Sequence, residues 1–234
     1  MKKKPIIELD NVSFTYGSSP FLENVSLKIY EKDFIGLVGP NGGGKTTLIQ
    51  LILGLLEPKK GKIRVFGKKP KDGRGQIGYL SQHENVDFDF PITVEEIALS
   101  GRMNGKAVKY FNEEDRETVA RVLKRLNLSP LAKRKLNELS GGEKQRAFIA
   151  RALGANPKIL LLDEPVSNVD IKLSDDFFAL LKELNKEIAI IVAEHNLQML
   201  SKYAKKVVCI NKCNFHGVRY HDLQELKGKK IHDL

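Results

Sequence analysis

The sequence predicts an α/β fold that carries a helical insertion in the middle of the chain. Short β-type segments and helices share the two outer parts, residues 1–82 and 156–234, whereas residues 83–155 have the character of helices. The 234 residues are enough for one large domain with its own core. We therefore expect a single domain over residues 1–234, in which the outer parts form an α/β core and the middle part forms a helical subdomain.

Five β-type segments are expected before residue 82. The last three end in glycine or polar residues, as buried strands often do. A helix is expected over residues 45–57, and it should be buried because it is apolar on nearly all sides. The expected strands cover residues 6–16, 24–30, 33–39, 61–67 and 76–81.

Similar patterns predict the remaining elements. Residues 112–128 place four apolar side chains on one helical face and acidic residues in the first turn, which favours a helix. The four apolar residues are Val119, Val122, Leu123 and Leu126. After residue 157 the chain returns to alternating strands and helices. These elements are expected at residues 158–163, 174–185, 187–194, from about Leu197, and 205–212.

Composition narrows the class of protein. Hydrophobic residues make up 41% and charged residues 29%, as in ordinary soluble proteins, and no apolar run approaches the roughly 20 residues that span a membrane. The two cysteines are too few for a disulfide scaffold and suit a reducing cytosol. The net charge of +10 allows phosphates, anionic lipid or nucleic acid as partners, but scattered lysines and the absence of Trp favour a solvated basic surface.

A glycine-rich stretch, GPNGGGKTT, lies between an expected strand and an expected helix and fits the pattern GxxxxGK[ST]. Its backbone N–H groups can surround phosphate oxygens, and the helix N-terminus adds positive potential. Lys45 can reach the β- and γ-phosphates, and the Thr46 hydroxyl can bind Mg²⁺. A plain glycine-rich turn is the alternative. The residues assigned to nucleotide binding here are Gly39, Pro40, Asn41, Gly42, Gly43, Gly44, Lys45, Thr46 and Thr47.

Two adjacent carboxylates end the apolar segment KILLLDEP at residues 158–165. Asp163 is expected to hold Mg²⁺ through its water shell, and Glu164 to stand where a hydrolytic water needs a base or an acceptor. Many buried strands end in an acid, so this motif is weak alone. Together with the glycine-rich loop it predicts a two-part site for Mg²⁺ and a nucleoside triphosphate.

The stretch LSGGEKQR, residues 139–146, places Ser140, Gly141 and Gly142 at the start of a helix, where exposed N–H groups form a second anion-binding terminus. Only one loop carries the lysine. The simplest explanation is that the two termini serve different copies of the chain, with the nucleotide held between them head to tail. The alternative is an ordinary helix capped by Ser140.

With these motifs in order, the chain from about Ile6 to His195 resembles the ATP-binding subunits of ABC transporters. The resemblance implies a P-loop NTPase core of the ABC type, with an antiparallel β subdomain and an inserted helical subdomain, and it implies ATP and Mg²⁺ as ligands. It further implies that Tyr16 stacks on adenine. Gln82 would sense the γ-phosphate and Mg²⁺ and report to the membrane subunit, and residues 140–142 would contact ATP on the opposite subunit.

The same resemblance assigns the rest of the site. Asp163 would be the metal-associated carboxylate and Glu164 the catalytic one. The loop SNVD, which ends in Asp170, would lie at the dimer seam, and His195 would hydrogen-bond the γ-phosphate. Without the other motifs, His195 would be interpreted as a core or capping residue. The expected catalytic set is Lys45, Gln82, Glu164 and His195, and the expected metal set is Thr46, Gln82 and Asp163.

Two positions depart from the commoner pattern of the family. Glu143 stands where the signature often has Gln, which places a carboxylate near the neighbouring subunit's nucleotide and could slow turnover. Asn196 follows His195 where Asp is usual, and Asn can cap the helix from Leu197 equally well. Neither departure predicts an inactive ATPase.

The resemblance also implies partners. We expect a head-to-tail homodimer with ATP sandwiched in it, bound to transmembrane permease subunits at the cytoplasmic face of the cell membrane, in a system with an extracytoplasmic solute-binding protein. Residues 82–102 look like the metal-ion uptake branch, whose ATPases serve zinc, manganese or iron importers. Siderophore, haem or cobalamin uptake is the nearest alternative. A soluble ABC-type ATPase acting on nucleic acid is a further alternative, although no nucleic-acid partner is expected.

An acidic, aromatic stretch interrupts the basic chain, because no Lys or Arg occurs from Gly75 to Gly101. We expect Phe88, Phe90 and Pro91 to help form a groove for a cytoplasmic helix of the membrane subunit, while nearby acids meet its basic residues. The alternative is a solvated loop with Phe90 in the local core. The acids are Glu84, Asp87 and Asp89.

Cys209, Cys213, His216 and His221 lie close together near the C-terminus and raise the idea of a zinc site, although their spacing is not a diagnostic one. A β-hairpin that turns near Lys212, with Cys209 packed as a small hydrophobic residue, explains the stretch better.

Overall fold

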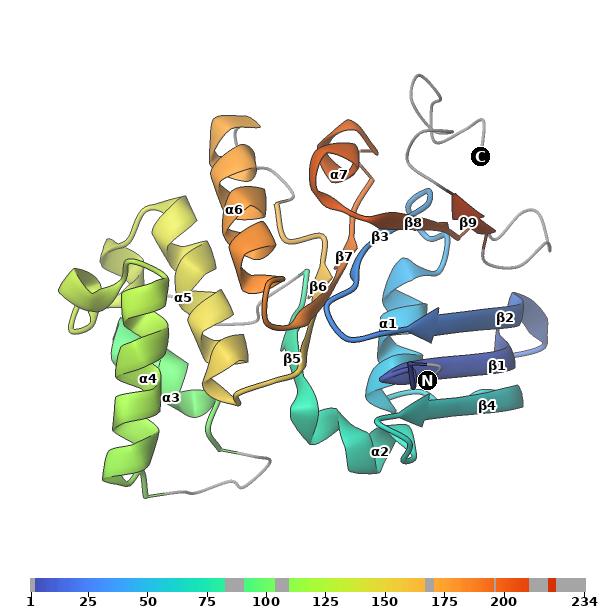
Figure 1. Ribbon diagram of the computed structural model, residues 1–234, viewed down its shortest axis with the longest axis horizontal. Helices are drawn as coiled ribbons and strands as arrows, with labels where there is room; N and C mark the ends of the chain where they lie inside the picture. The colour runs from blue at the N-terminus through green and yellow to red at the C-terminus, as the bar shows by residue number, and fades with distance from the viewer. Residues whose placement is uncertain are drawn as a thin grey trace.

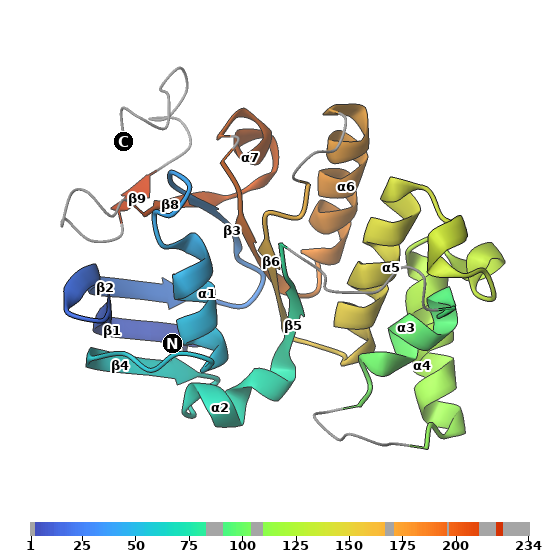
Figure 2. The ribbon, with the colours of Figure 1, turned by 180° about the vertical axis from the view of Figure 1, so that it is seen from behind.

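The computed structural model describes residues 3–82, 91–103, 110–166, 171–195, 197–210 and 219–221. These residues form a three-stranded sheet, a six-stranded sheet and a group of helices (Figures 1 and 2). The three-stranded sheet and the helical group lie at opposite ends of the longest axis, and the six-stranded sheet stands between them. The α/β fold expected from the sequence is confirmed.

The smaller sheet is antiparallel and has the strand order β2–β1–β4. These strands are β1 (Ile7–Tyr16), β2 (Ser19–Ile29) and β4 (Lys60–Val65). β2 begins at residue 19 rather than at 24, so β1 and β2 form a hairpin across Gly17 and Ser18. Pro20 obscured this start in the sequence, since proline within a sheet is confined to edge strands such as β2.

β4 shows that the expectation of a buried strand over residues 61–67 is wrong. Only Ile63 and Val65 of this strand are buried, while Lys62 and Arg64 are exposed. β4 is an edge strand of an antiparallel sheet. One face of such a sheet can meet water, so its side chains alternate between core and solvent.

The larger sheet has the strand order β5–β6–β7–β3–β8–β9, in which the first five strands are parallel and β9 is antiparallel to β8. Its strands are β3 (Phe34–Val38), β5 (Ile77–Leu80), β6 (Ile159–Asp163), β7 (Ala189–Ala193), β8 (Lys206–Cys209) and β9 (Arg219–His221). Every residue of β3, β6 and β7 is buried. The expected central strands and the expected C-terminal pairing are confirmed, and Cys209 is buried among hydrophobic residues.

α1 (Lys45–Leu53) packs in one hydrophobic core with strands of both sheets. Seven of its residues are buried, which confirms the expected buried helix. It ends at Leu53 rather than at residue 57 because Gly54 takes a left-handed conformation with φ of 68°, a common way to end a helix.

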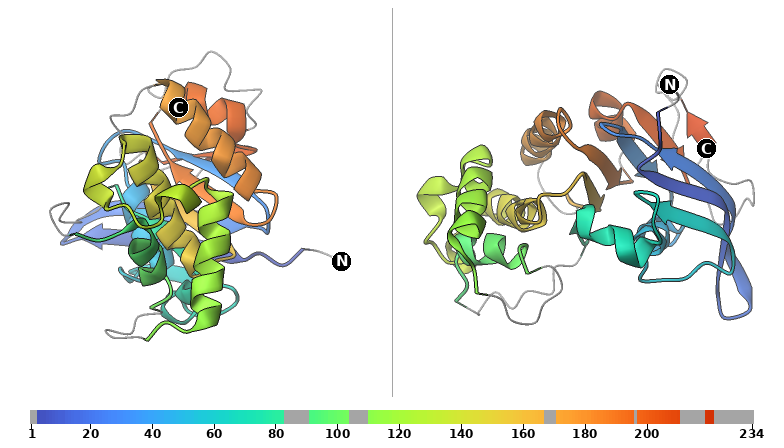
Figure 3. Two further views of the ribbon diagram at one scale, coloured as in Figure 1. Left: turned by 90° about the vertical axis from the view of Figure 1, so that its left-hand side faces the viewer. Right: turned by 60° about the horizontal axis from the view of Figure 1, so that its bottom comes forward.

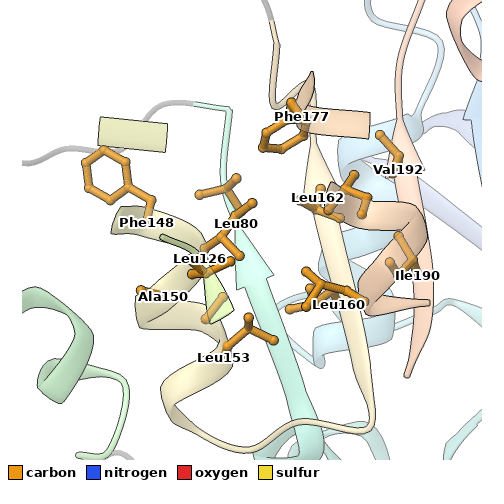
Figure 4. Close-up of a cluster of buried hydrophobic side chains, with 14 of the residues drawn as sticks. Leu80, Leu126, Phe148, Ala150, Leu153, Leu160, Leu162, Phe177, Ile190 and Val192 are labelled. Carbon is orange, nitrogen blue, oxygen red and sulfur yellow. The ribbon is translucent and has the colours of Figure 1, made fainter. Parts of the chain in front are cut away.

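The helical group contains α3 (Val94–Ser100), α4 (Glu113–Arg125) and α5 (Gly141–Gly154), and Figure 3 shows it on the side away from β1, β2 and β4. A second core joins this group to the larger sheet. In Figure 4, Phe148 and Leu153 of α5 lie near Leu80 of β5 and Leu160 of β6. The remaining helices are α2 (Pro70–Gly73), α6 (Ile171–Leu184) and α7 (Leu197–Tyr203).

Each helix of this group begins with a capping box, in which a polar side chain and the residue three positions later bond each other's backbone N–H. The pairs are Thr93–Glu96, Asn112–Asp115 and Ser140–Glu143. Asp115 is also buried and accepts a 2.8 Å hydrogen bond from Nε of Arg102. Capping and burial therefore fix where the three helices start.

No helix within the described residues has the length and apolar character needed to cross a membrane. The described side chains include no group of three or more His, Cys, Asp or Glu residues arranged for a metal ion. Cys213, His216 and the side chain of His221, which belong to the possible zinc site, lie outside the described part of the chain.

Candidate functional site

The glycine-rich loop connects the C-terminal end of β3 to the N-terminus of α1, as its motif requires. Gly42 and Gly44 have φ angles of 72° and 111°, which side chains rarely adopt. A Cβ on Gly39 would lie 2.1 Å from the carbonyl oxygen of Ile210. The loop can therefore follow this path only because these positions lack side chains.

Lys45 is buried at the first position of α1, with 4% of its side chain exposed. Its Nζ donates to the carbonyl oxygens of Gly39 at 2.9 Å and Pro40 at 3.3 Å. The same Nζ lies 3.3 Å from Oε1 of Glu164. These oxygen atoms hold the ammonium group beside the loop, where it can pair with a bound phosphate.

Glu164 directly follows β6 and links three parts of the chain. Its backbone N–H donates to the carbonyl oxygen of Ala193 at 2.9 Å, and its Oε2 accepts a 2.6 Å hydrogen bond from Nε2 of Gln82. Its φ of 47° is unusual for a residue with a side chain and often marks a functional position. Lys45, Gln82 and Glu164 thus form one chain of polar contacts.

A cavity of about 280 Å³ opens beside these three residues. Its wall contains loop residues 41–47, Gln82, Glu164 and also Phe21 of β2. Phe21 was not among the expected site residues. The pair Gly17–Ser18 is the signal that could have found it, because Gly-Ser between two strand patterns predicts a hairpin that returns β2 beside Tyr16.

Tyr16 ends β1 near this cavity. Its hydroxyl lies 3.3 Å from Oγ1 of Thr47, and its ring makes edge-to-face contacts with Phe14 and Phe21 at centroid distances of 4.8 and 5.0 Å. Half of the residue remains exposed. The ring is therefore held in place while part of it stays available to stack on a planar base.

The donor set expected for Mg²⁺ fits that ion. Thr46 and Gln82 line the cavity and supply a hydroxyl and an amide oxygen, and Asp163 adds a carboxylate; oxygen atoms of these kinds are what Mg²⁺ prefers. Asp163 ends β6 with 1% exposure and does not belong to the cavity wall. This position suits a contact through water rather than a direct one.

β7 is followed by Glu194 and His195. Glu194 is buried, its backbone N–H donates to the carbonyl oxygen of Leu37 at 3.0 Å, and burial raises the pKa of its carboxyl. His195 is exposed, with its Nδ1 3.7 Å from Oε2 of Glu194. His195 is not among the residues that line the cavity.

The signature stretch stands at the start of α5. Oε2 of Glu143 accepts hydrogen bonds from Oγ of Ser140 at 2.7 Å and from its backbone N–H at 2.8 Å, and these bonds lower the pKa of Glu143. Further along the helix, the Gln145 amide donates to the carbonyl oxygen of Pro165, just after Glu164. No residue of 139–146 lines the cavity of its own chain.

Several expected residues lie outside the described part of the chain, so the dimer-seam carboxylate and the groove for a partner helix stay predictions. Pro91, the last residue expected in that groove, is described and exposed. The residues outside are Glu84, Asp87, Phe88, Asp89, Phe90, Asp170 and Asn196.

Comparison with known proteins shows a family model and ATP-binding proteins that are similar to this chain in sequence. The family model described as ABC transporter matches residues 22–167. The zinc uptake system ATP-binding protein ZurA of Listeria monocytogenes is 41% identical over 227 residues, which cover 94% of this chain and 88% of ZurA. The manganese transport system ATP-binding protein MntB of Bacillus subtilis is 40% identical over 199 residues, which cover 84% and 80% of the two chains.

Solved structures of ABC transporters and of their ATP-binding cassettes are also similar to this chain. The ADP conformation of an ATP-binding cassette of an ABC transporter matches with a TM-score of 0.86 and 27% identity, covering 99% of this chain and 98% of that one. An inward-facing transporter of metal-chelate type matches with a TM-score of 0.83 and 28% identity, covering 95% and 84%. The resemblance noted in the sequence is confirmed: this chain belongs to the ABC transporter family and is an ABC-type ATPase.

Proposed function

We propose that the chain is the ATP-hydrolysing subunit of a membrane transporter that imports a divalent metal ion. The observation that supports its role in hydrolysis is the meeting of Lys45, Gln82 and Glu164 on the wall of one cavity beside the phosphate-binding loop. The metal cargo rests on the relatives, since ZurA is named for zinc uptake and MntB for manganese transport.

Hydrolysis of a γ-phosphate needs positioning and charge stabilisation more than covalent chemistry. Lys45 and the loop N–H groups bind the triphosphate. Glu164 orients the attacking water and accepts its proton at a carboxylate oxygen, while Gln82, bonded to Oε2, fixes the direction of that carboxylate. Thr46, Gln82 and Asp163 would hold Mg²⁺, which supplies neutralisation of the phosphate charge when bound.

The proposed active unit is a head-to-tail homodimer with two ATP molecules between the subunits. Ser140 and Gly141 are exposed and do not line their own chain's cavity, which leaves them available to the γ-phosphate bound by the other copy. His195 and Asp170 would join that interface. The dimer would bind transmembrane permease subunits at the cytoplasmic face of the cell membrane, in a system with an extracytoplasmic solute-binding protein.

Import of a metal chelate such as a siderophore, haem or cobalamin is the second candidate. It is favoured by the likeness to the inward-facing transporter of metal-chelate type, at 28% identity. Zinc or manganese stays the first candidate because the relatives named for those ions share about 40% identity with this chain.

Phosphate release by the purified chain tests the proposed role of Glu164. E164Q keeps the size of the side chain but cannot accept a proton, so we expect turnover to fall at least about a hundredfold while ATP binding is retained. The matched control is E114Q, which removes an exposed carboxylate on α4. Undiminished hydrolysis in E164Q would refute the role of Glu164.

Uptake measured with the permease tests the cargo. Cells that co-express the chain and its membrane subunit are supplied with labelled zinc, manganese or a ferric chelate, and the K45A variant serves as the blank. We expect accumulation of zinc or manganese that depends on Lys45. Accumulation of the chelate alone would replace the first candidate by the second.

A further inference from the structure

A second cavity, of about 970 Å³, lies at the end of α1 that points away from the phosphate-binding loop. Gly54 and the residues just after it, β4, and the segment that leads into α2 form its wall. Figure 1 shows α2 beside β4, at the end of α1 opposite the loop. The nine-residue α1 separates the two cavities by about 13 Å, at 1.5 Å per residue.

Five basic side chains and only two acidic ones line this cavity, which we call the basic cavity. Lys71 is paired with Glu57 at 2.8 Å. The other four basic residues form no ion pair with any residue in the described ranges. They are Lys62, Arg64, Lys68 and Lys69. The stretch 57–74 contains eight Lys and Arg against two acids, so it carries +6 of the chain's net +10.

Protection of a sheet edge explains only part of this charge. Lys62 and Arg64 stand on the edge strand β4, where charged side chains prevent pairing with another strand. Lys68 and Lys69 follow β4 and lead into α2, outside any strand, where no such protection is needed. A charge cluster on both sides of a cavity instead indicates a site that attracts anions.

Acidic residues on the neighbouring strand do not neutralise the cluster. In the register of β1 and β4, Asp10 stands across from Lys62 and Glu8 across from Arg64. Glu8 is already paired with Lys28 at 3.1 Å, and neither acid lines the basic cavity. With five basic side chains against Glu57 and Asp72, the wall of the cavity therefore keeps a net positive charge.

Apolar groups stand among these charges. Leu56, Pro58, Ile63 and Pro70 line the basic cavity, and Leu55, which lies between two lining residues, is 58% exposed. A small inorganic anion gains nothing from such a wall. An amphiphile that carries an anionic phosphate beside hydrocarbon gains from both kinds of contact.

We propose that the basic cavity binds the phosphate headgroups of anionic lipids at the surface of the bilayer. This inference rests on the proposed function, which places the chain against a membrane through its permease partner. Clusters of four to eight Lys or Arg residues attract anionic leaflets. The cavity has charges enough for this, and Leu55 offers an apolar contact beside them.

Sedimentation of the full chain with lipid vesicles tests the proposal. Vesicles of phosphatidylcholine alone are compared with vesicles that contain about one third phosphatidylglycerol, at low and high NaCl. The test variant is K62Q/K68Q/K69Q. The control is K124Q/K135Q/K182Q, which removes three exposed lysines, on α4, opposite Thr93 and on α6, and so makes the same change in net charge.

We expect salt-sensitive binding to the anionic vesicles only. The cavity variant should bind about a hundredfold more weakly than the parent, because 1 kcal/mol per lysine is about a fivefold factor for each of three residues. The control should lose much less. Equal weakening in both variants, or no binding of the parent chain to anionic vesicles, would overturn the proposal.

Two further measurements separate the possible explanations. Pyrophosphate is titrated into the parent chain and the cavity variant. If pyrophosphate binds only when the three lysines are present, and the parent chain does not bind vesicles, the site belongs to a free phosphate instead of a lipid. Phosphate release from ATP is followed in the same samples. If the parent chain hydrolyses ATP but does not bind vesicles, only the lipid-binding inference is refuted. An inactive parent chain would contradict the proposed function.

Discussion

The Nζ atom of Lys45 lies 3.3 Å from Oε1 of Glu164, and both side chains are largely buried. The other carboxylate oxygen of Glu164 is held by Gln82 at 2.6 Å. The lysine that should bind phosphate is therefore already partnered by the carboxylate that should act on water. A phosphate group that approaches Lys45 meets the negative charge of Glu164 beside it.

This relationship predicts an effect of E164Q on binding as well as on turnover. Gln removes the negative charge that competes for Lys45 but can still accept the bond from Gln82. We expect ATP to bind about tenfold more tightly in the absence of Mg²⁺, in line with about 1.5 kcal/mol for a charged hydrogen bond. Equilibrium titration with a fluorescent ATP analogue measures this. Weaker binding than in the parent chain would contradict the competition.

Gln82 should matter more for the rate than for the affinity. Q82A leaves Oε2 of Glu164 without the partner that aims the carboxylate, so we expect kcat to fall about 10- to 100-fold while KM changes less than threefold. Steady-state phosphate release measures both constants. A rise in KM at constant kcat would show instead that Gln82 mainly binds substrate.

Two variants of Tyr16 separate the contribution of its ring to ATP binding from that of its hydroxyl. Y16A removes the exposed ring and should raise the KM for ATP about tenfold, since base–aromatic stacking contributes about 1–3 kcal/mol. Y16F removes only the hydroxyl near Thr47 and should leave KM within about twofold. Equal losses in the two variants would indicate that the hydroxyl positions the loop.

Glu143 and Glu96 occupy the same place in two capping boxes, which offers a matched comparison. E143Q removes a negative charge from the helix start that is proposed to face the partner's ATP, so ATP-driven dimerisation should tighten about fivefold. E96Q makes the same change in α3 and should leave dimerisation unchanged. Analytical ultracentrifugation with ATP measures the difference, and equal shifts in the two variants would contradict the proposed interface.

Glu194 should make stability depend on pH. Burial raises the pKa of its carboxyl above the ordinary value of 4.5, so the folded chain holds this proton more tightly than the unfolded chain. Its contribution to the free energy of unfolding is present below pH 4.5 and is lost as the pH rises through the folded-state pKa.

E194Q cannot ionise, so it should lose less stability than the parent chain above pH 4.5. At neutral pH we expect it to unfold about 2–4 °C higher for each kcal/mol recovered from the buried charge. Thermal unfolding from pH 4.5 to pH 8 measures both effects. Parallel curves for the two proteins would contradict the raised pKa.

The sequence predicted those parts of the molecule that depend on neighbours along the chain. The glycine-rich loop, the helix expected over residues 112–128 and the central strands each follow from a short pattern, and all of them appear in the structure. The exposure of β4 could not be predicted, because it depends on where the strand stands in its sheet. The strand start at Ser19 was missed because Pro20 resembles a loop residue until β2 is known to be an edge.

The contacts within the site are also beyond sequence patterns. Gln82 and Glu164 are 82 positions apart, and their bond exists because β5 and β6 are neighbours in the larger sheet. Phe21 enters the cavity wall only through the hairpin of β1 and β2. Motifs identified the groups that do the chemistry, while strand order decided which of them meet.

That strand order has a consequence for how the chain emerges from the ribosome. β3 ends in the glycine-rich loop, yet its neighbours β7 and β8 are synthesised about 150 and about 170 residues later. At the end of β3, the carbonyl oxygen of Leu37 accepts a hydrogen bond from the backbone N–H of Glu194, which follows β7. The carbonyl oxygen of Val38 accepts one from the backbone N–H of Ile210, which follows β8. A nascent chain halted before residue 189 should therefore fail to retain nucleotide, although its complete phosphate-binding motif was translated early.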